Sequence, residues 1–226
     1  METVNCFGHH LVLGHCDQLD YYVNDDINSA VERIFSLPEV DNRERDAKWD
    51  SHYGDGATSE FNPYLGPEHI SGAKELMNWI KEQCFEALKE YGIDGTGIEI
   101  TRSWMNKMNY KSQGRCHQHM GLDQESYQPI KMNSGDAPTT YNYGLDETPD
   151  LVAIFYVTNQ SEGASLVVVK EGVFGTLPSD MEESNKHCIL PKSGDLIIHR
   201  PEVWHAVSEH LSHIPRICFA FHLKAT

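Results

Sequence analysis

The chain has 226 residues, of which 39% are hydrophobic and 23% are charged, a composition typical of a globular protein rather than a disordered one. Its formal net charge is −16 at pH 7, which argues against binding of duplex nucleic acid or of anionic membranes, because both depend on a basic surface. No segment comes near the roughly 18 consecutive apolar residues that a membrane-spanning helix needs.

The cysteines and the first residues bear on the cellular compartment. The six cysteines form no Cys-x-x-Cys pair, and in a chain of this length they indicate reduced thiols rather than a disulfide framework. The first residues lack the basic stretch and apolar run of a secretion signal, so we expect a cytoplasmic protein. The 13 histidines direct attention to metal binding, since neutral imidazole is the commonest metal ligand.

The first part of the chain predicts little regular structure before one long helix. Residues 1–66 are polar and rich in turn formers, and we expect them to be irregular. Apolar residues then recur at steps of three and four over about 67–91, which predicts an amphipathic helix that ends at Gly92. This helix is expected to pack its apolar face on a sheet.

Strand patterns dominate from residue 95 onwards. β-Branched and aromatic residues form short runs, separated by turn residues, at 98–104, 151–157, 166–169, 195–199 and 216–222. Many short strands with few helices favour a sandwich or barrel. The stretch 120–150 has no period and is expected to be an insertion that is functional or mobile. We predict a single domain over 1–226, with an N-terminal irregular segment and packing helix in 1–95 and a β core in 96–226.

Two histidines that flank one glutamine are the first candidate metal ligands. In a β-strand, residues i and i+2 point to the same face, about 6.7 Å apart along the strand, so His117 and His119 would direct both imidazoles to one point. A third ligand must come from elsewhere, and His205, which follows a strand and a turn, is the best candidate. With 13 histidines in the chain such a pair also arises by chance, so these residues alone leave both interpretations open.

An arginine at the start of the last predicted strand is the second candidate. The alternating residues on one face of this strand are Arg216, Cys218, Ala220 and His222. The other face carries only large apolar residues and should pack in the core. If the first face lines a barrel, the small residues leave room beside Arg216, and a buried guanidinium needs an anionic partner such as a carboxylate ligand. An exposed arginine, or one paired with Asp or Glu, is the simpler alternative.

Taken in order, these residues resemble the iron(II)- and 2-oxoglutarate-dependent oxygenase superfamily, whose signature is a His-x-acid motif, a distal His and an Arg shortly beyond it. More narrowly, the chain is similar to an oxygenase family of marine phages and bacteria that carries a His-x-His motif. The matching segments, in chain order, are Ser103-Trp104-Met105-Asn106, His117-Gln118-His119, Ile154-Phe155-Tyr156-Val157, Gly163-Ala164-Ser165-Leu166, Pro191-Lys192-Ser193-Gly194-Asp195-Leu196, Trp204-His205 and Arg216-Ile217. No single motif is specific, but the ordered set is.

This resemblance implies a mainly β fold with flanking helices, the double-stranded β-helix or jelly roll, and an iron site near one mouth. His117 and His205 would be iron ligands, and His119 stands where the superfamily has Asp or Glu. The narrower family shares the second histidine, which supports His119 as a ligand. Three histidines form a neutral site, which would alter the metal preference, so another divalent metal could replace iron. Asp123 could supply a carboxylate instead, and His199 is a further candidate.

The resemblance also implies an enzyme that uses 2-oxoglutarate as cosubstrate. Arg216 would bind its distal carboxylate, and Tyr156 and Asn106 fall where such enzymes place further cosubstrate contacts. The expected activity is oxidation by molecular oxygen, most simply hydroxylation, of a small-molecule or peptidyl substrate. For a chain of phage origin, the compartment would be the host cytoplasm. The alternative is a non-enzymatic, metal-binding jelly-roll or cupin-like module, because a fold of this kind does not dictate function.

Overall fold

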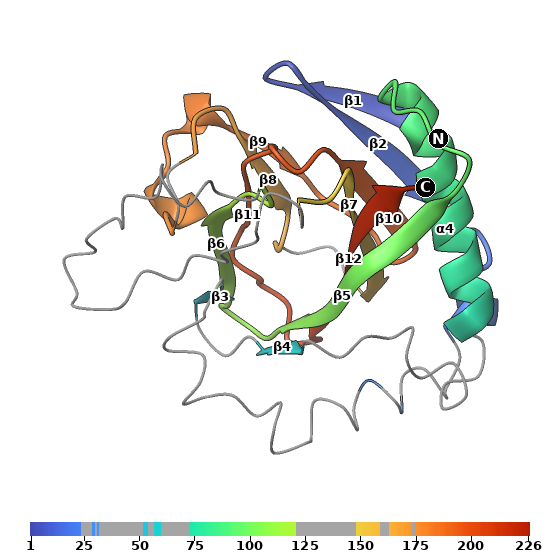
Figure 1. The fold of residues 1–226 in the computed structure, drawn as a ribbon. Helices are drawn as coiled ribbons and strands as arrows, with labels where there is room; N and C mark the ends of the chain where they lie inside the picture. Colours follow the sequence, from blue (N-terminus) through green and yellow to red (C-terminus); the bar gives the residue numbers. More distant parts are fainter. Residues whose placement is uncertain are drawn as a thin grey trace.

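Two antiparallel β-sheets face each other and form the body of the molecule (Figure 1). The computed structural model describes residues 1–23, 29, 31, 52–53, 57–59, 73–120, 148–158, 163–172 and 175–226. Over these residues, the seven-stranded sheet has the order β1 (Glu2–Cys6), β2 (His9–His15), β10 (Asp195–His199), β7 (Leu151–Thr158), β12 (Arg216–Ala225), β5 (Ile98–Met108) and β4 (Ala57–Ser59). The five-stranded sheet has the order β3 (His52–Tyr53), β6 (Gln113–His117), β11 (His205–Val207), β8 (Leu166–Val169) and β9 (Lys186–Ile189). The helices that the structure describes over their whole length are α1 (Leu19–Tyr22), α4 (Ala73–Glu90) and the short 3-10 helices η2 (Pro178–Asp180) and η3 (Glu183–Asn185).

Helix α4 covers the outer face of the seven-stranded sheet (Figure 1). The buried residues that pack together at this interface include Leu76, Ile80, Cys84 and Leu88 of the helix and Phe155 and Phe221 of the sheet. The amphipathic helix predicted over about 67–91 is therefore confirmed for 73–90, and its predicted first residues lie outside the described part of the chain. Among the described helices, none combines the length and the apolar character that a membrane span requires.

The strands predicted from the sequence of the β core are present. The runs expected at 98–104, 151–157, 166–169, 195–199 and 216–222 correspond to β5, β7, β8, β10 and β12. Strands β6 and β11 have five and three residues and contain no run of β-branched and aromatic residues. They are recognised as strands only by their pairing with neighbouring strands. The insertion expected over 120–150 lies, from 121 to 147, outside the described residues.

Strand β12 separates two environments, as its alternating sequence predicted. The residues that belong to the core beneath α4 are Ile217, Phe219, Phe221 and Leu223. Arg216, Cys218 and Ala220 instead line a cavity between the two sheets. Because β12 pairs on one side with β7 and on the other with β5, these inward side chains lie in the middle of the seven-stranded sheet.

The structure corrects the expectation of an irregular N-terminal segment. Residues 2–15 form the hairpin β1–β2, whose turn at Phe7 and Gly8 has φ values of 54° and 85°, the left-handed conformation that a tight hairpin requires. Strand β2 then pairs with β10, so that His15 lies opposite Asp195, 180 positions later. The prediction relied on the polar composition and the turn formers of residues 1–66, and neither reports this pairing. The hairpin is held in place by a distant partner strand that no local pattern reveals.

Replacing Ile80 with alanine is expected to lower the free energy of unfolding by about 2–5 kcal/mol, because Ile80 is fully buried on the face of α4 that packs on the sheet, and alanine leaves a cavity there. Urea denaturation measures the change. Lys89→Ala on the exposed side of the same helix is the matched control and should alter stability by less than about 0.5 kcal/mol. A loss below about 1 kcal/mol for Ile80→Ala would contradict the packing described for α4.

Candidate metal centre

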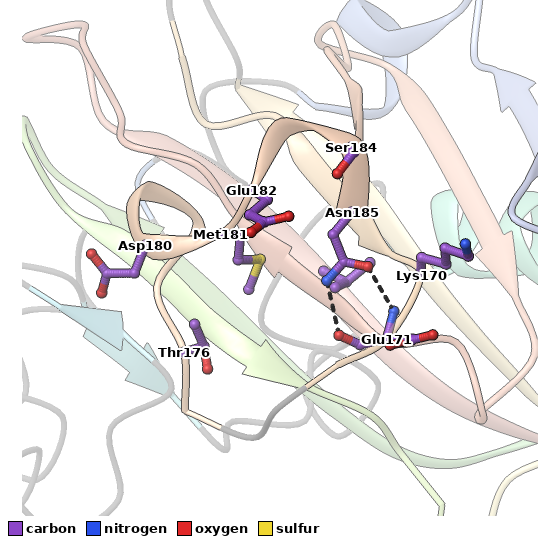
Figure 2. Close-up of a pocket in the computed structure, with 9 residues that line it drawn as sticks. Lys170, Glu171, Thr176, Asp180, Met181, Glu182, Ser184 and Asn185 are labelled. Atoms are coloured by element: carbon purple, nitrogen blue, oxygen red, sulfur yellow. Dashed lines mark hydrogen bonds between the residues drawn. The ribbon is translucent and has the colours of Figure 1, made fainter.

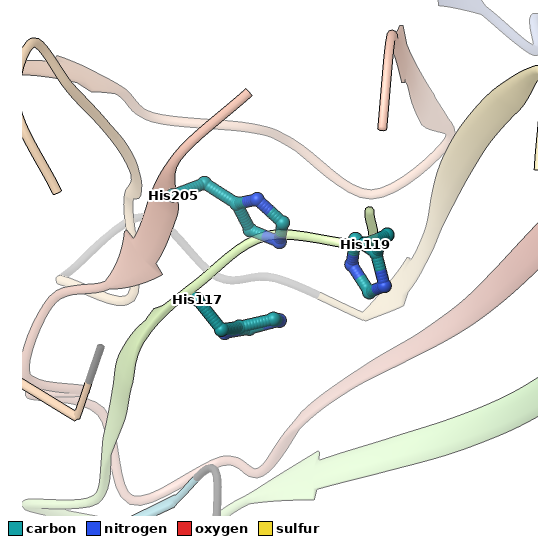
Figure 3. Close-up of side chains that lie close together, drawn as sticks. All are labelled: His117, His119 and His205. Carbon is teal, nitrogen blue, oxygen red and sulfur yellow. The ribbon is translucent and has the colours of Figure 1, made fainter. Parts of the chain in front are cut away.

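Three histidines converge in the cavity between the two sheets (Figure 3). His117 ends β6 and lies directly opposite His205 of β11, and their ring centroids are 4.3 Å apart. His119 follows two residues after β6, held by its backbone N–H, which donates to the Pro201 carbonyl at 2.9 Å, and its ring lies 5.1 Å from each of the other two. The candidate ligand atoms all lie within 4.8 Å of one another, and no other group of three or more His, Cys, Asp or Glu residues with metal-binding geometry occurs among the described residues.

Backbone carbonyls set the tautomers of two of these histidines. The Nδ1 of His117 lies 2.8 Å from the Arg115 carbonyl, and the Nδ1 of His205 lies 3.0 Å from the Val203 carbonyl. A carbonyl oxygen only accepts, so each Nδ1 carries the proton and donates it. The Nε2 lone pair of each ring is thereby left available, which is the state in which histidine binds a metal ion.

The three histidines are uncharged in the folded protein. Burial lowers the pKa of His117, and it lowers the pKa of His119 and of His205 well below the usual value, with the neighbouring histidines as the second cause for these two. Protonation would place like charges side by side among buried groups. The centre therefore offers three neutral nitrogen donors at neutral pH and no carboxylate among its described ligand candidates.

Of the two alternative ligands considered from the sequence, Asp123 lies outside the described residues. His199, at the end of β10, is fully buried, and its ring centroid lies 4.8 Å from that of His205 and 6.3 Å from that of His119. Its Nδ1–H donates to the Arg200 carbonyl at 2.8 Å, whereas its Nε2 has no hydrogen-bond partner in the described part of the chain. His199 is thus a neighbour of the three-histidine cluster rather than one of its members.

Another buried histidine, His222 of β12, contacts His119 directly. The two nearest ring nitrogens, Nε2 of His222 and Nδ1 of His119, are 2.9 Å apart. The alternation of β12 correctly put His222 on the same face as Arg216, but nothing in the sequence indicated its partner. The contact spans 103 positions, so only the folded arrangement reveals it.

Acid is expected to destabilise the metal-free protein, because its buried histidines must take up protons on unfolding. Burial lowers the pKa of His199 to about 4 and, together with Arg102, lowers that of His222 to about 3, against about 6.5 in an unfolded chain. Between these values the unfolded state binds more protons, so stability is full above about pH 6.5 and falls toward pH 4. Each of the two histidines should lower the free energy of unfolding by about 2 kcal/mol at pH 5. Equal urea midpoints at pH 7 and pH 5 would contradict this expectation.

Arg216 lines the same cavity as the three histidines. The volume of this cavity is about 50 Å³. Arg216 is 2% exposed, and its carbon Cζ lies 4.8 Å from the centre of the Tyr156 ring. One of its terminal nitrogens donates to the sulfur of Met108 at 3.2 Å, while its Nε has no hydrogen-bond partner among the described residues. None of the described ion pairs involves Arg216, so this buried cation has no carboxylate counter-ion in that part of the chain.

Two further polar residues predicted from the sequence lie beside Arg216. The Tyr156 hydroxyl is buried without a hydrogen-bond partner in the described structure, and burial raises its pKa to about 12, so it keeps its proton. Asn106 lines the cavity and places its amide nitrogen 3.8 Å from the sulfur of Cys218. The structure therefore brings all six residues singled out from the sequence to one region, with the histidines and Arg216 on opposite sheets.

A second, larger cavity of about 430 Å³ lies beside β8 and the two short helices η2 and η3 (Figure 2). Lys170 and several carboxylates line it, and the Asn185 side chain bonds to both the backbone N–H and the carbonyl of Glu171 at 3.0 Å. It shares no lining residue with the histidine cavity, and its acidic side chains form no metal-binding group. The hydrogen bonds between Asn185 and Glu171 thus stabilise the backbone beside this cavity, and its described residues indicate no catalytic or metal site.

Comparison with known proteins gives no match to a family model and none to a curated protein. Solved structures are similar. HygX from Streptomyces hygroscopicus, crystallised with nickel, 2-oxoglutarate and hygromycin B, has a TM-score of 0.58 at 13% identity, over 96% of this chain and 83% of that one. A prolyl-4-hydroxylase from Pseudomonas putida has a TM-score of 0.51 at 12% identity, over 96% and 94%.

A third similar structure is SnoN, a non-haem, α-ketoglutarate-dependent epimerase from nogalamycin biosynthesis, with a TM-score of 0.53 at 10% identity, over 95% of this chain and 77% of that one. At such identities the likeness concerns the fold. It confirms the predicted mainly β architecture, and the chain has the double-stranded β-helix, or jelly-roll, fold of these enzymes.

Proposed function

We propose that this protein is an iron(II)- and 2-oxoglutarate-dependent oxygenase that hydroxylates a small-molecule or peptidyl substrate. The observation that carries the proposal is the content of one cavity, which combines three neutral imidazoles with a buried guanidinium that has no described carboxylate partner. A metal and a dicarboxylate would satisfy both features at once. The similar structures support this, since HygX was crystallised with 2-oxoglutarate and SnoN is described as α-ketoglutarate-dependent.

The three-histidine cluster fits a divalent transition metal. Imidazole nitrogen suits iron, nickel and related ions, and three protein ligands leave positions open for other groups. His117 and His205 already present their Nε2 lone pairs, and His119 would complete the set. Because none of the three is charged, the protein would leave the full positive charge of the ion uncompensated. An anionic cosubstrate is therefore favoured next to the metal.

The environment of Arg216 fits the far end of a dicarboxylate. A buried charge that lacks a partner costs several kcal/mol, and a carboxylate bound through paired hydrogen bonds offsets that cost. The Tyr156 hydroxyl would donate a further hydrogen bond, because it retains its proton and has no described acceptor. Asn106 would add an amide contact from the neighbouring strand β5. The opposite end of the same molecule would then face the three histidines.

When bound, iron(II) and 2-oxoglutarate supply the oxidising chemistry, in which O₂, 2-oxoglutarate and the substrate R–H are converted to R–OH, succinate and CO₂. The residues of the chain would position these groups. The three histidines would hold the metal at one end of the site, and Arg216 would hold the distal carboxylate at the other end. Val152, Ile154 and Leu166 give the cavity an apolar wall that would exclude water. Rigid strands carry most of these groups, which suits a site that must fix its ligands closely.

The test is binding of 2-oxoglutarate followed by its turnover. Without oxygen, 2-oxoglutarate should raise the melting temperature of the iron(II)-loaded protein and have a much smaller effect on the metal-free protein. On admission of air, slow formation of succinate is expected even without the true substrate. A protein that binds metal but shows no response to millimolar 2-oxoglutarate would instead be a binding module of the cupin type.

Domain organisation and compartment belong to the same proposal. The protein would act as one domain over residues 1–226, which is supported by the shared sheet of the N-terminal hairpin and β12. A cytoplasmic location is supported by the six free cysteines, five of them buried. The sequence motifs given above support membership in the oxygenase family of marine phages and bacteria, and for a chain of phage origin the compartment would be the host cytoplasm.

A further inference from the structure

The candidate ligand His119 is in contact with a histidine of the opposite sheet. His222 lies on the inward side of β12, and its Nε2 is 2.9 Å from the Nδ1 of His119. Their exposed fractions are 2% and 6%. The ring of Trp104 stands perpendicular to His222 at a centroid distance of 5.0 Å and lies 5.8 Å from His119, so it contacts both members of the pair. The pair joins the seven-stranded sheet to the segment that follows β6.

The three candidate ligands differ in what holds their Nδ1 atoms. For His117 and His205 the partner is a backbone carbonyl, which can only accept and so fixes the tautomer by itself. For His119 the partner is a ring nitrogen of His222, which can accept or donate. The Nε2 of His119 is free to bind a metal only when its Nδ1 carries the proton, and this requires His222 to accept.

We propose that His222 is a positioning residue for the metal centre: its Nε2 accepts the Nδ1–H of His119 and so directs the His119 Nε2 lone pair to the metal. The inference rests on the proposed function, because it takes the three histidines as metal ligands. It concerns the one ligand position at which the sequence departs from the oxygenase signature. Loss of such an outer partner lowers metal affinity by about 10–100-fold.

The experiment compares His222→Phe with His222→Gln in a titration with Co²⁺ against a competing chelator. Phenylalanine keeps a ring beside Trp104 but cannot accept, so affinity should fall by about 10–100-fold and the visible spectrum of bound Co²⁺ should change. Glutamine can place an amide oxygen near the position of Nε2, so it should restore affinity to within about threefold of wild type, with the wild-type spectrum. Unchanged affinity in His222→Phe, or equal loss in both variants, would overturn the proposal.

A matched control is His210→Phe, since His210 is equally buried but bonds to the Ile214 carbonyl and lines no part of the histidine cavity. It should leave Co²⁺ affinity unchanged. If His222→Phe does not fold, His222→Leu, which also cannot accept, is interpreted in the same way. Wild-type protein that binds Co²⁺ but not 2-oxoglutarate would refute the proposed function and leave this test valid. If wild type binds no metal, both proposals are refuted.

Discussion

Replacing His205 with alanine is expected to abolish metal binding at the candidate centre and, with it, the conversion of 2-oxoglutarate to succinate. His205 lies opposite His117 on the neighbouring strand, and its ring is 4.3 Å and 5.1 Å from those of the other two histidines. Its loss removes one of three neutral donors, and no described carboxylate stands ready to replace it. Metal affinity should fall by more than the roughly 100-fold that loss of an outer partner causes. Metal content after dialysis and succinate formation under air measure the two effects.

A control for general histidine loss is His187→Ala, because His187 lies exposed on the edge strand β9. It should keep both metal and turnover. The circular dichroism and urea midpoint of metal-free His205→Ala should show that the variant folds. If that variant retained wild-type metal content and succinate formation, the three-histidine centre would not be the site of the reaction.

Replacing Arg216 with methionine is expected to weaken 2-oxoglutarate binding while the metal content stays unchanged. Methionine keeps an unbranched apolar chain in the cavity and removes the charged donor group. Truncation of one partner of a buried, hydrogen-bonded charge pair costs about 2–5 kcal/mol, which corresponds to at least 30-fold in the dissociation constant. Anaerobic calorimetric titration of the metal-loaded variant with 2-oxoglutarate gives this constant directly.

The separation of the two effects is what distinguishes a cosubstrate contact from a structural role. Arg200→Met is a suitable control, since the side chain of Arg200 is 37% exposed and its Nε lies 3.6 Å from a carboxylate oxygen of Glu202. It should leave 2-oxoglutarate binding at the wild-type level. Joint loss of metal and 2-oxoglutarate in Arg216→Met, with a lowered urea midpoint, would assign Arg216 to the stability of the sheet instead.

The parts of the fold that could be predicted from the sequence are those that a local period reports. The alternation in β12 distinguished the face under α4 from the face of Arg216 because each strand residue reverses the direction of its side chain. In α4, apolar residues that recur every three or four positions distinguished the buried face of the helix from its exposed face. The hairpin at 2–15 could not be predicted in this way, since its stability comes from pairing with β10, 180 positions distant at His15.

The same distinction applies to the candidate site. His117 and His119 could be predicted from the sequence because residues two positions apart in an extended chain share a face. Arg216 could be predicted because a cation among small and apolar residues demands an explanation. The contact of His222 with His119 could not be predicted from the sequence, because it joins residues 103 positions apart across two sheets. Among the described residues the Nε2 of His199 has no hydrogen-bond partner, and this too is visible only in the folded structure.

The central place of β12 has a consequence for biosynthesis. Strands β5 and β7 flank it, so until the ribosome has made β12 each of them has an open edge of unpaired backbone groups. Such edges favour association between nascent chains and make a chaperone useful at that stage. The same order of synthesis affects the cavity. Arg216 and His222 belong to β12, so a chain in which β12 is not yet made has His117, His119 and His205 but lacks both the buried guanidinium and the histidine that contacts His119.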